Sequence, residues 1–145
     1  MGLLDKIIGK KEMINGLDHV AIVVSDMDRS IEFYTEILEL RLILDGRAGG
    51  GEKKSFLGTK SKAIVALSED KNRLIQKGDY VEGVNHVAFG VDDLGKSSRI
   101  LQDRGVEFVE IKKGEDGKPE AYHFLDPDGL ELEIYGQSEK EVPKY

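Results

Sequence analysis

The 145-residue chain has no cysteine, no tryptophan and only three histidines. Without cysteine, disulfides, thiolate nucleophiles and cysteine-based zinc sites are excluded, so any bound metal must be held by His, Asp or Glu. No apolar run approaches the roughly 20 residues that a membrane span requires. Residues 1–14 lack the apolar core and the cleavage site of a signal peptide. We therefore expect a protein of the reducing cytoplasm that does not associate with membranes.

The chain also has fewer basic than acidic residues, 21 against 28, and its net charge is −7. This balance works against attraction to phosphate backbones and anionic lipid surfaces, so we expect no nucleic-acid partner. With 39% apolar residues, the chain is suited to one globular domain with a real core.

The sequence contains an internal repeat with one fixed offset. GLDHVAIVVSD (16–26) and GVNHVAFGVDD (83–93) align residue by residue, and the alignment places His19 opposite His86. In each copy, a short apolar run is followed by a helical pattern and then by three further short strands. The repeat predicts an α+β fold with two βαβββ modules in tandem, whose cupped mixed sheets share a concave surface.

The pattern divides the chain into five segments, and each strand and helix can be placed within them. The segments are an N-terminal leader or short helix (1–15), a first module (16–68), a connection (69–82), a second module (83–136) and a mobile tail (137–145). Strands are predicted at 17–24, 40–46, 53–59, 61–68, 84–91, 106–112, 119–125 and 130–136, with one helix of about three turns before Leu38 and another from Asp92 or Asp93 to Gly105.

His19 and His86 are the first candidates for chemistry. Each is followed on its own strand face by small residues, which leaves open space in front of the imidazole. Taken alone, each histidine is more often a hydrogen-bonded structural residue. The repeat favours a joint role, because packing of two equivalent modules brings equivalent positions together.

Glu133 shares a strand face with Glu131 and Tyr135. For Glu131 we favour an exposed position at the edge of a half-buried strand. Glu133 differs, because its repeat equivalent, Ala66, lies in a strongly apolar strand that is expected to face inward. A buried carboxylate requires compensation, and a metal ion held by two neutral imidazoles is one way to supply it.

Three stretches carry a resemblance to a known family: DHVAIVVSDMDRSIEFYTEILEL, NHVAFGVDDL and FLDPDGLELEIY. Over residues 16–136 the chain resembles the vicinal oxygen chelate superfamily, which includes glyoxalase I, extradiol dioxygenases, methylmalonyl-CoA epimerase and the fosfomycin and bleomycin resistance proteins. The resemblance implies that His19, His86 and Glu133 hold one divalent metal ion per site. Fe²⁺, Mn²⁺, Ni²⁺ and Zn²⁺ all remain open.

The ligand count bears on the reaction. Glyoxalase I and the epimerase have a fourth protein ligand in the last strand of the first unit, and Ala66 stands there in this chain. Three protein ligands leave coordination positions on the metal ion open for a small oxygenated substrate and for dioxygen. We therefore favour dioxygenase chemistry slightly over the alternatives. The alternatives are non-redox lyase, epimerase or fosfomycin-type thiol transfer, and a non-catalytic binding protein of the bleomycin-resistance type, which the three ligands disfavour.

Two further residues are considered. His123 stands where extradiol dioxygenases usually have a tyrosine, and it is either a proton shuttle or, as we favour, a partly exposed strand histidine. Arg47, in the loop 46–54, is a candidate for contacting an anionic group of the substrate. Superfamily members join their modules within one chain or by exchange between chains, and we expect a homodimer that acts on a small molecule.

Overall fold

The computed structural model describes residues 13–48, 54–74 and 83–136. Most of the predicted leader, the second half of the connection and the whole tail lie outside the described residues. The elements are β1 (Val20–Val24), α2 (Met27–Glu32), the π-helical turn η1 (Phe33–Ile37), β2 (Arg41–Leu44), the 3₁₀ turn η2 (Gly46–Ala48), β3 (Lys54–Gly58), β4 (Ala63–Glu69), β5 (His86–Val91), α3 (Leu94–Asp103), β6 (Glu110–Lys113), β7 (Pro119–Leu125) and β8 (Glu131–Gly136).

Two four-stranded mixed sheets confirm the tandem βαβββ prediction. Sheet A has the order β1-β4-β3-β2 and sheet B has the order β5-β8-β7-β6, and the first pair in each is parallel. The register repeats as well: Ala21 pairs with Ala66 in sheet A, and their repeat equivalents Ala88 and Glu133 pair in sheet B. The duplication seen in the sequence is therefore a duplication of strand pairing.

The helix of each module begins at an aspartate. The Asp26 carboxylate accepts a hydrogen bond from the Arg29 backbone N–H at 3.1 Å, and the Asp93 carboxylate accepts one from Lys96 at 2.9 Å. Both residues are N-caps with extended backbones, and they satisfy N–H groups that lack partners in the first turn. The sequence left Asp92 and Asp93 open, and the structure shows that Asp93 is the cap.

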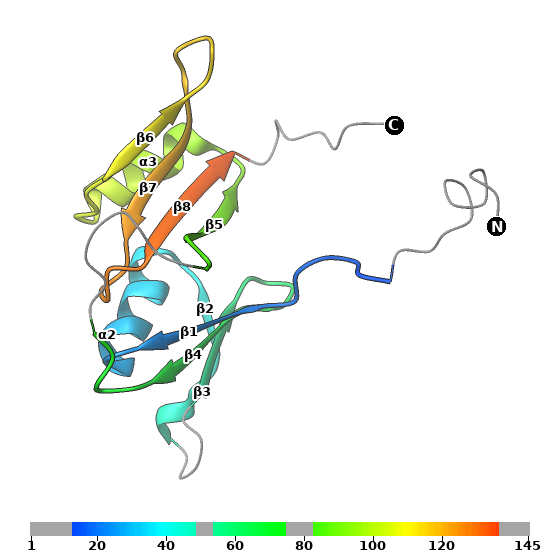
Figure 1. The fold of residues 1–145 in the computed structure, drawn as a ribbon, viewed down its shortest axis with the longest axis vertical. Helices are drawn as coiled ribbons and strands as arrows, with labels where there is room; N and C mark the ends of the chain where they lie inside the picture. Colours follow the sequence, from blue (N-terminus) through cyan, green and yellow to red (C-terminus); the bar gives the residue numbers. More distant parts are fainter. Residues whose placement is uncertain (1–12, 49–53, 75–82, 137–145) are drawn as a thin grey trace, which may run out of the picture.

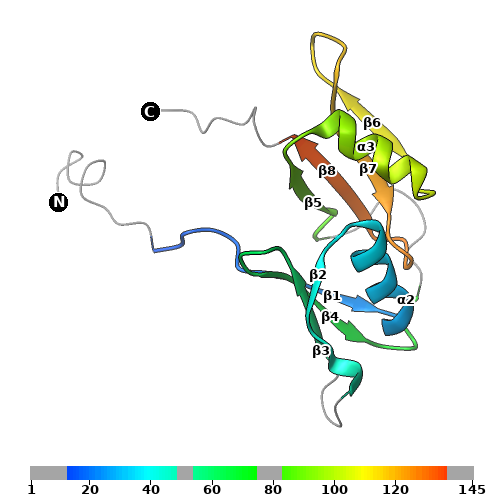
Figure 2. The ribbon, with the colours of Figure 1, turned by 180° about the vertical axis from the view of Figure 1, so that it is seen from behind.

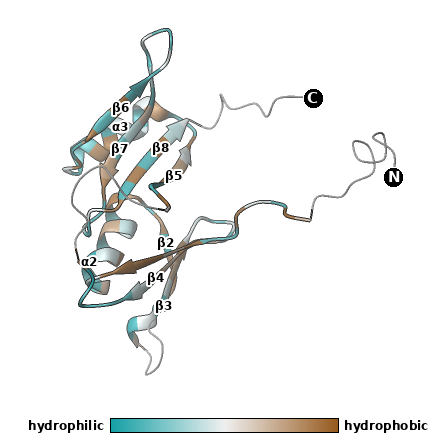
Figure 3. Cartoon of the chain, in the orientation of Figure 1, coloured by the Kyte–Doolittle hydropathy of each residue, from teal (hydrophilic) through white to brown (hydrophobic). Residues whose placement is uncertain are grey.

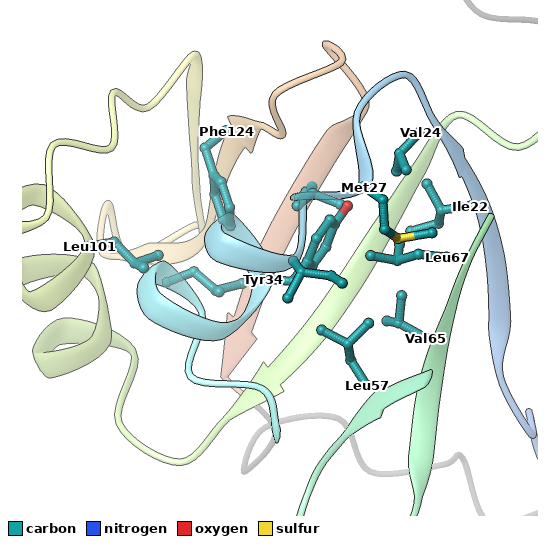
Figure 4. Packing of buried hydrophobic residues seen from close by; sticks show 12 residues of the cluster. Ile22, Val24, Met27, Tyr34, Leu57, Val65, Leu67, Leu101 and Phe124 are labelled. Atoms are coloured by element: carbon teal, nitrogen blue, oxygen red, sulfur yellow. The ribbon is translucent and has the colours of Figure 1, made fainter. Parts of the chain in front are cut away.

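One continuous apolar core joins the two modules. Figures 1 and 2 show the sheets one above the other along the long axis, with α2 beside sheet A and α3 across one face of sheet B. In Figure 4, Tyr34 of η1 lies in the same cluster as Leu101 of α3 and Phe124 of β7. Tyr34 and Phe124 are completely buried. The helix-facing side of each sheet is therefore covered, and we call the opposite side of each sheet its open face.

The DPDG turn between β7 and β8 connects the modules. Gly129 adopts a φ of +82° there, a left-handed backbone conformation that glycine reaches without a steric cost. Asp126 accepts a hydrogen bond from the Tyr34 hydroxyl at 2.8 Å, and Asp128, fully buried, accepts hydrogen bonds from the backbone N–H and the hydroxyl of Ser25. The two carboxylates of the turn therefore bind the second module to the first.

No helix among the described residues has the length and apolar character needed to cross a bilayer. Figure 3 shows that β1 is hydrophobic along its length, whereas the loop joining β6 to β7 is mostly hydrophilic. Strand β1 alternates between covered and uncovered side chains, because Ile22 and Val24 are buried while Val23 is 46% exposed on the open face of sheet A. Apolar surface is therefore left on that face of the described chain.

Candidate metal site

His86 and Glu133 meet on the open face of sheet B. His86 is the first residue of β5, Glu133 lies in the neighbouring strand β8, and the imidazole Nε2 is 2.9 Å from the carboxylate Oε2. Glu133 is only 4% exposed, as its repeat relationship to an apolar strand predicted. A buried carboxylate of this kind requires a positive partner.

The other nitrogen of each histidine is occupied in the same way in both modules. His86 Nδ1 lies 2.9 Å from the amide oxygen of Asn85, and His19 Nδ1 lies 2.7 Å from a carboxylate oxygen of Asp18. Because both oxygens accept hydrogen bonds, Nδ1 is the donor in each ring, and Nε2 is the nitrogen that would bind a metal. Hydrogen bonds of this kind fix the tautomer and direction of metal-binding histidines.

The hydrogen bond from His19 also lowers the pKa of the Asp18 carboxyl. Our sequence reasoning missed these two positioning residues. The signal was present, because Asp18 and Asn85 are themselves equivalent in the repeat and each directly precedes its histidine.

His86 donates through Nδ1 to Asn85 and turns Nε2 toward a carboxylate oxygen of Glu133. Two groups 2.9 Å apart share positive charge, either a proton on Nε2 or a cation bound to both. A divalent metal ion bound to both groups supplies that charge, and imidazole and carboxylate are suitable ligands for Zn²⁺, Fe²⁺, Mn²⁺ or Ni²⁺. The residues present therefore fit two corners of the predicted metal site.

His19, the third predicted ligand, lies apart from this pair. It precedes β1 rather than lying within it, its side chain is 43% exposed, and its ring contacts Phe56 with a centroid separation of 6.2 Å. Among the residues that the structure describes, no group of three ligand atoms within 4.8 Å of one another includes His19. The fold of a single chain therefore brings together His86 and Glu133 but leaves His19 on the open face of sheet A.

His123 is buried, which corrects our expectation of a partly exposed strand histidine. It is 1% exposed, and its Nε2 lies 3.2 Å from Oε2 of Glu133, while its ring centroid is 5.3 Å from that of His86. The reason is its position in β7, an inner strand of sheet B, where it pairs directly with Glu133. His123 is therefore adjacent to the candidate site.

Glu131 also departs from its expected place at an exposed edge. Strand β8 lies between β5 and β7 and is not an edge strand, and the Glu131 side chain is 27% exposed. Its Oε1 lies 3.5 Å from Nδ1 of His123. Period-two alternation identified the shared face of Glu131 and Glu133 but could not place the strand within the sheet.

Arg47 is held by two carboxylates of its own module. Its guanidinium donates to Asp45 at 2.9 and 2.7 Å and to Asp28 at 3.0 Å. These hydrogen bonds lower the pKa of Asp45 to about 2. The guanidinium has five N–H donors and uses three of them in these hydrogen bonds, so the role of Arg47 in contacting an anionic group stays a prediction.

The fold is that of a two-module protein in which a histidine and a buried glutamate meet on the open face of sheet B. The sequence profile of the Glyoxalase/Bleomycin resistance protein/Dioxygenase superfamily matches residues 16–134, and the chain belongs to this superfamily.

Relatives of known name are similar at low identity. A glutathione transferase FosA from Serratia marcescens is 33% identical over 128 residues, covering 85% of this chain and 82% of the relative. A metallothiol transferase FosB from Staphylococcus epidermidis is 27% identical over 134 residues, covering 91% and 89%. Among solved structures, an integron cassette protein from the mobile metagenome of the Halifax Harbour sewage outfall has a TM-score of 0.66 and 28% identity, covering 85% of this chain and 99% of that one.

Proposed function

We propose that this protein is a cytoplasmic, divalent-metal-dependent enzyme whose site combines His86 and Glu133 of one chain with His19 of a second copy. The observation that carries the proposal is the 2.9 Å approach of His86 Nε2 to Oε2 of the buried Glu133. A metal ion bound to both groups would stabilise the buried carboxylate, and the pair would supply two of the three ligands that the sequence indicates.

The exposed surface of sheet A supports a homodimer. Its open face carries His19 beside Phe56 and the 46% exposed side chain of Val23. Exposed apolar surface of this kind is typical of an interface. A two-fold dimer would cover the open face of sheet A in one copy with the open face of sheet B in the other, and would form two equivalent sites. His19 of each copy would then complete the ligand set of its partner.

The reaction best supported is transfer of a thiol to a small oxygenated electrophile. When bound, the metal ion supplies Lewis acidity that withdraws electron density from a substrate oxygen. His86 and Glu133 would hold the ion, and Asn85 would fix the direction of His86. His123, 3.2 Å from Glu133, would position the carboxylate. The relatives named as metallothiol and glutathione transferases support this reaction class.

Dioxygenase chemistry is the second candidate. It is favoured by Ala66, which occupies the place of a fourth ligand and leaves more metal positions open for substrate and dioxygen. A non-catalytic binding role is third, because such a protein has no need for the oriented imidazoles of His19 and His86. The lyase and epimerase alternatives are weakened by the same alanine.

The test begins with metal content. The 145-residue chain purified without chelator should contain a bound transition-metal ion. Plasma mass spectrometry should show that the His86→Ala variant binds one ion fewer per chain. Glutathione or cysteine consumption with an epoxide such as fosfomycin should follow the metal content. Glu120→Gln, on β7 but on the other face from His123, should change neither quantity.

Oxygen uptake with catechols by an iron-loaded protein would transfer the assignment to dioxygenase chemistry. Identical metal content in wild type and in His86→Ala would overturn the metal site. Ligand binding that is unaffected by a His19→Ala, His86→Ala double substitution would instead support the binding protein.

A further inference from the structure

A second group of ligands lies on the open face of sheet B, outside the pair of His86 and Glu133. It consists of Glu110 on β6, His123 on β7 and Glu131 on β8, and one ligand atom from each lies within 4.8 Å of the others. Strand pairing explains the convergence, because Glu110 is directly opposite His123, and Glu131 is the diagonal neighbour of His123 across β7 and β8.

His123 is the buried member of this group, at 1% exposed, and its ring nitrogens are not hydrogen-bonded among the described residues. The nearest acceptors are Oε1 of Glu131, 3.5 Å from Nδ1, and Oε2 of Glu133, 3.2 Å from Nε2. A buried polar group without a hydrogen bond costs roughly 1–3 kcal/mol. The Nδ1 side of the ring, which faces Glu131, is therefore a position where a ligand would be stabilised.

The repeat shows that the fold itself does not require this group. The positions equivalent to His123 and Glu131 in the first module are Phe56 and Ile64. Phe56 pairs with Ala66 as His123 pairs with Glu133. Apolar side chains thus fit the same strand positions, and the imidazole and the carboxylate occur in the second module alone.

We propose that Glu110, His123 and Glu131 bind a second divalent cation, of the Zn²⁺ type, beside the site at His86 and Glu133. One imidazole and two carboxylates form a suitable donor set for Zn²⁺ and leave a position for water or for a substrate oxygen. The cation would also offset the repulsion among neighbouring carboxylates. Glu110 is exposed, so its side chain can turn inward to complete the coordination.

The proposal is independent of the proposed function, because the two sites use different ligands for their ions. The test is a Zn²⁺ titration of the full-length chain after chelator treatment, by calorimetry with the stoichiometry checked by mass spectrometry. The His86→Ala chain, in which the first site is disabled, should still bind one Zn²⁺ per chain. Adding Glu110→Gln or Glu131→Gln to it should weaken that binding by about tenfold or more.

Two further variants keep the test decisive. His123→Phe, the residue that the repeat accepts at this position, should remove the second ion without unfolding the chain, as circular dichroism would show. Glu120→Gln removes the same charge from the opposite face of β7 and should leave binding unchanged. Equal Zn²⁺ affinity in His86→Ala with and without Glu110→Gln and Glu131→Gln would overturn the second site. If the first site does not exist, the result would differ. The wild-type chain would bind one Zn²⁺, His86→Ala would still bind it, and Glu131→Gln would not.

Discussion

Phe56 and His123 occupy the same place in the two modules. Phe56 pairs with Ala66, and His123 pairs with Glu133 at the equivalent position of the second module. Each ring also lies beside the repeated histidine of its own module: the centroids of Phe56 and His19 are 6.2 Å apart, and those of His123 and His86 are 5.3 Å apart. The duplicated fold therefore presents a histidine beside an apolar ring in the first module, and a histidine beside a second imidazole and a buried carboxylate in the other.

This asymmetry predicts complementation between two inactive variants. His19→Ala and Glu133→Ala homodimers should each be inactive. After mixing under conditions that exchange subunits, half of the dimers are expected to be mixed, and each of these has one intact site, so activity should return to about a quarter of wild type. The measurement is turnover before and after exchange. No recovery, with exchange verified by mass spectrometry, would place all three ligands within one chain.

Asp128 should be the more important of the two carboxylates in the DPDG turn. It is fully buried, accepts two hydrogen bonds from Ser25 and lies 3.5 Å from the Arg29 guanidinium. Asp128→Ala removes the acceptor of the half-buried Ser25 donors, so the free energy of unfolding should fall by about 2 kcal/mol. Urea denaturation measures it, with the exposed Asp103→Ala as a control that should change stability by less than about 0.5 kcal/mol. Similar values for both would show that the turn does not hold the modules together.

Tyr34 predicts loss of stability in alkaline solution. Burial, and then the nearby Asp126 carboxylate, raise the pKa of the Tyr34 hydroxyl above its usual value of 10.0. The unfolded chain therefore releases this proton before the folded chain does. The protonated hydroxyl therefore contributes fully to the free energy of unfolding below about pH 10. As the pH rises above about 10, this contribution falls by up to about 1.4 kcal/mol per pH unit.

Tyr34→Phe should remove that part of the alkaline slope, although it also lowers stability near neutral pH by about 1–2 kcal/mol, because Asp126 loses its hydroxyl donor. Urea unfolding at several pH values between 8 and 11 would measure both effects. An unchanged slope in the variant would assign the alkaline loss to other groups.

The cap of α3 offers a local test of the fold. Asp93→Ala removes the carboxylate that accepts from the Lys96 N–H, and should lower the free energy of unfolding by about 1 kcal/mol. The adjacent Asp92→Ala is a matched control, because Asp92 precedes the cap and should have a smaller effect. Thermal unfolding of the two variants would compare them directly, and a larger loss for Asp92→Ala would contradict the assignment.

Much of this architecture could be predicted because its signals are local or repeated. The strands are short alternating or apolar runs bounded by turn residues, and the constant offset of the repeat indicates which segments are equivalent. The repeat also indicated that Glu133 would be buried, since Ala66 lies in an apolar strand. These features depend on neighbours in sequence, or on comparison of one half of the chain with the other.

The surroundings of His123, Glu131 and the DPDG turn depended on tertiary structure. Alternation assigns side chains to a face, but it does not say which strands are internal or what covers a face, and so both His123 and Glu131 were expected to be more exposed than they are. The contacts of Asp128 with Ser25 join residues 103 positions apart, and no local pattern encodes them. The sequence by itself determined the two modules and the side chains that are candidate metal ligands. Only the packing of strands and modules decided which of these side chains meet in one chain, because the burial of a side chain and its distance from another are properties of the whole fold.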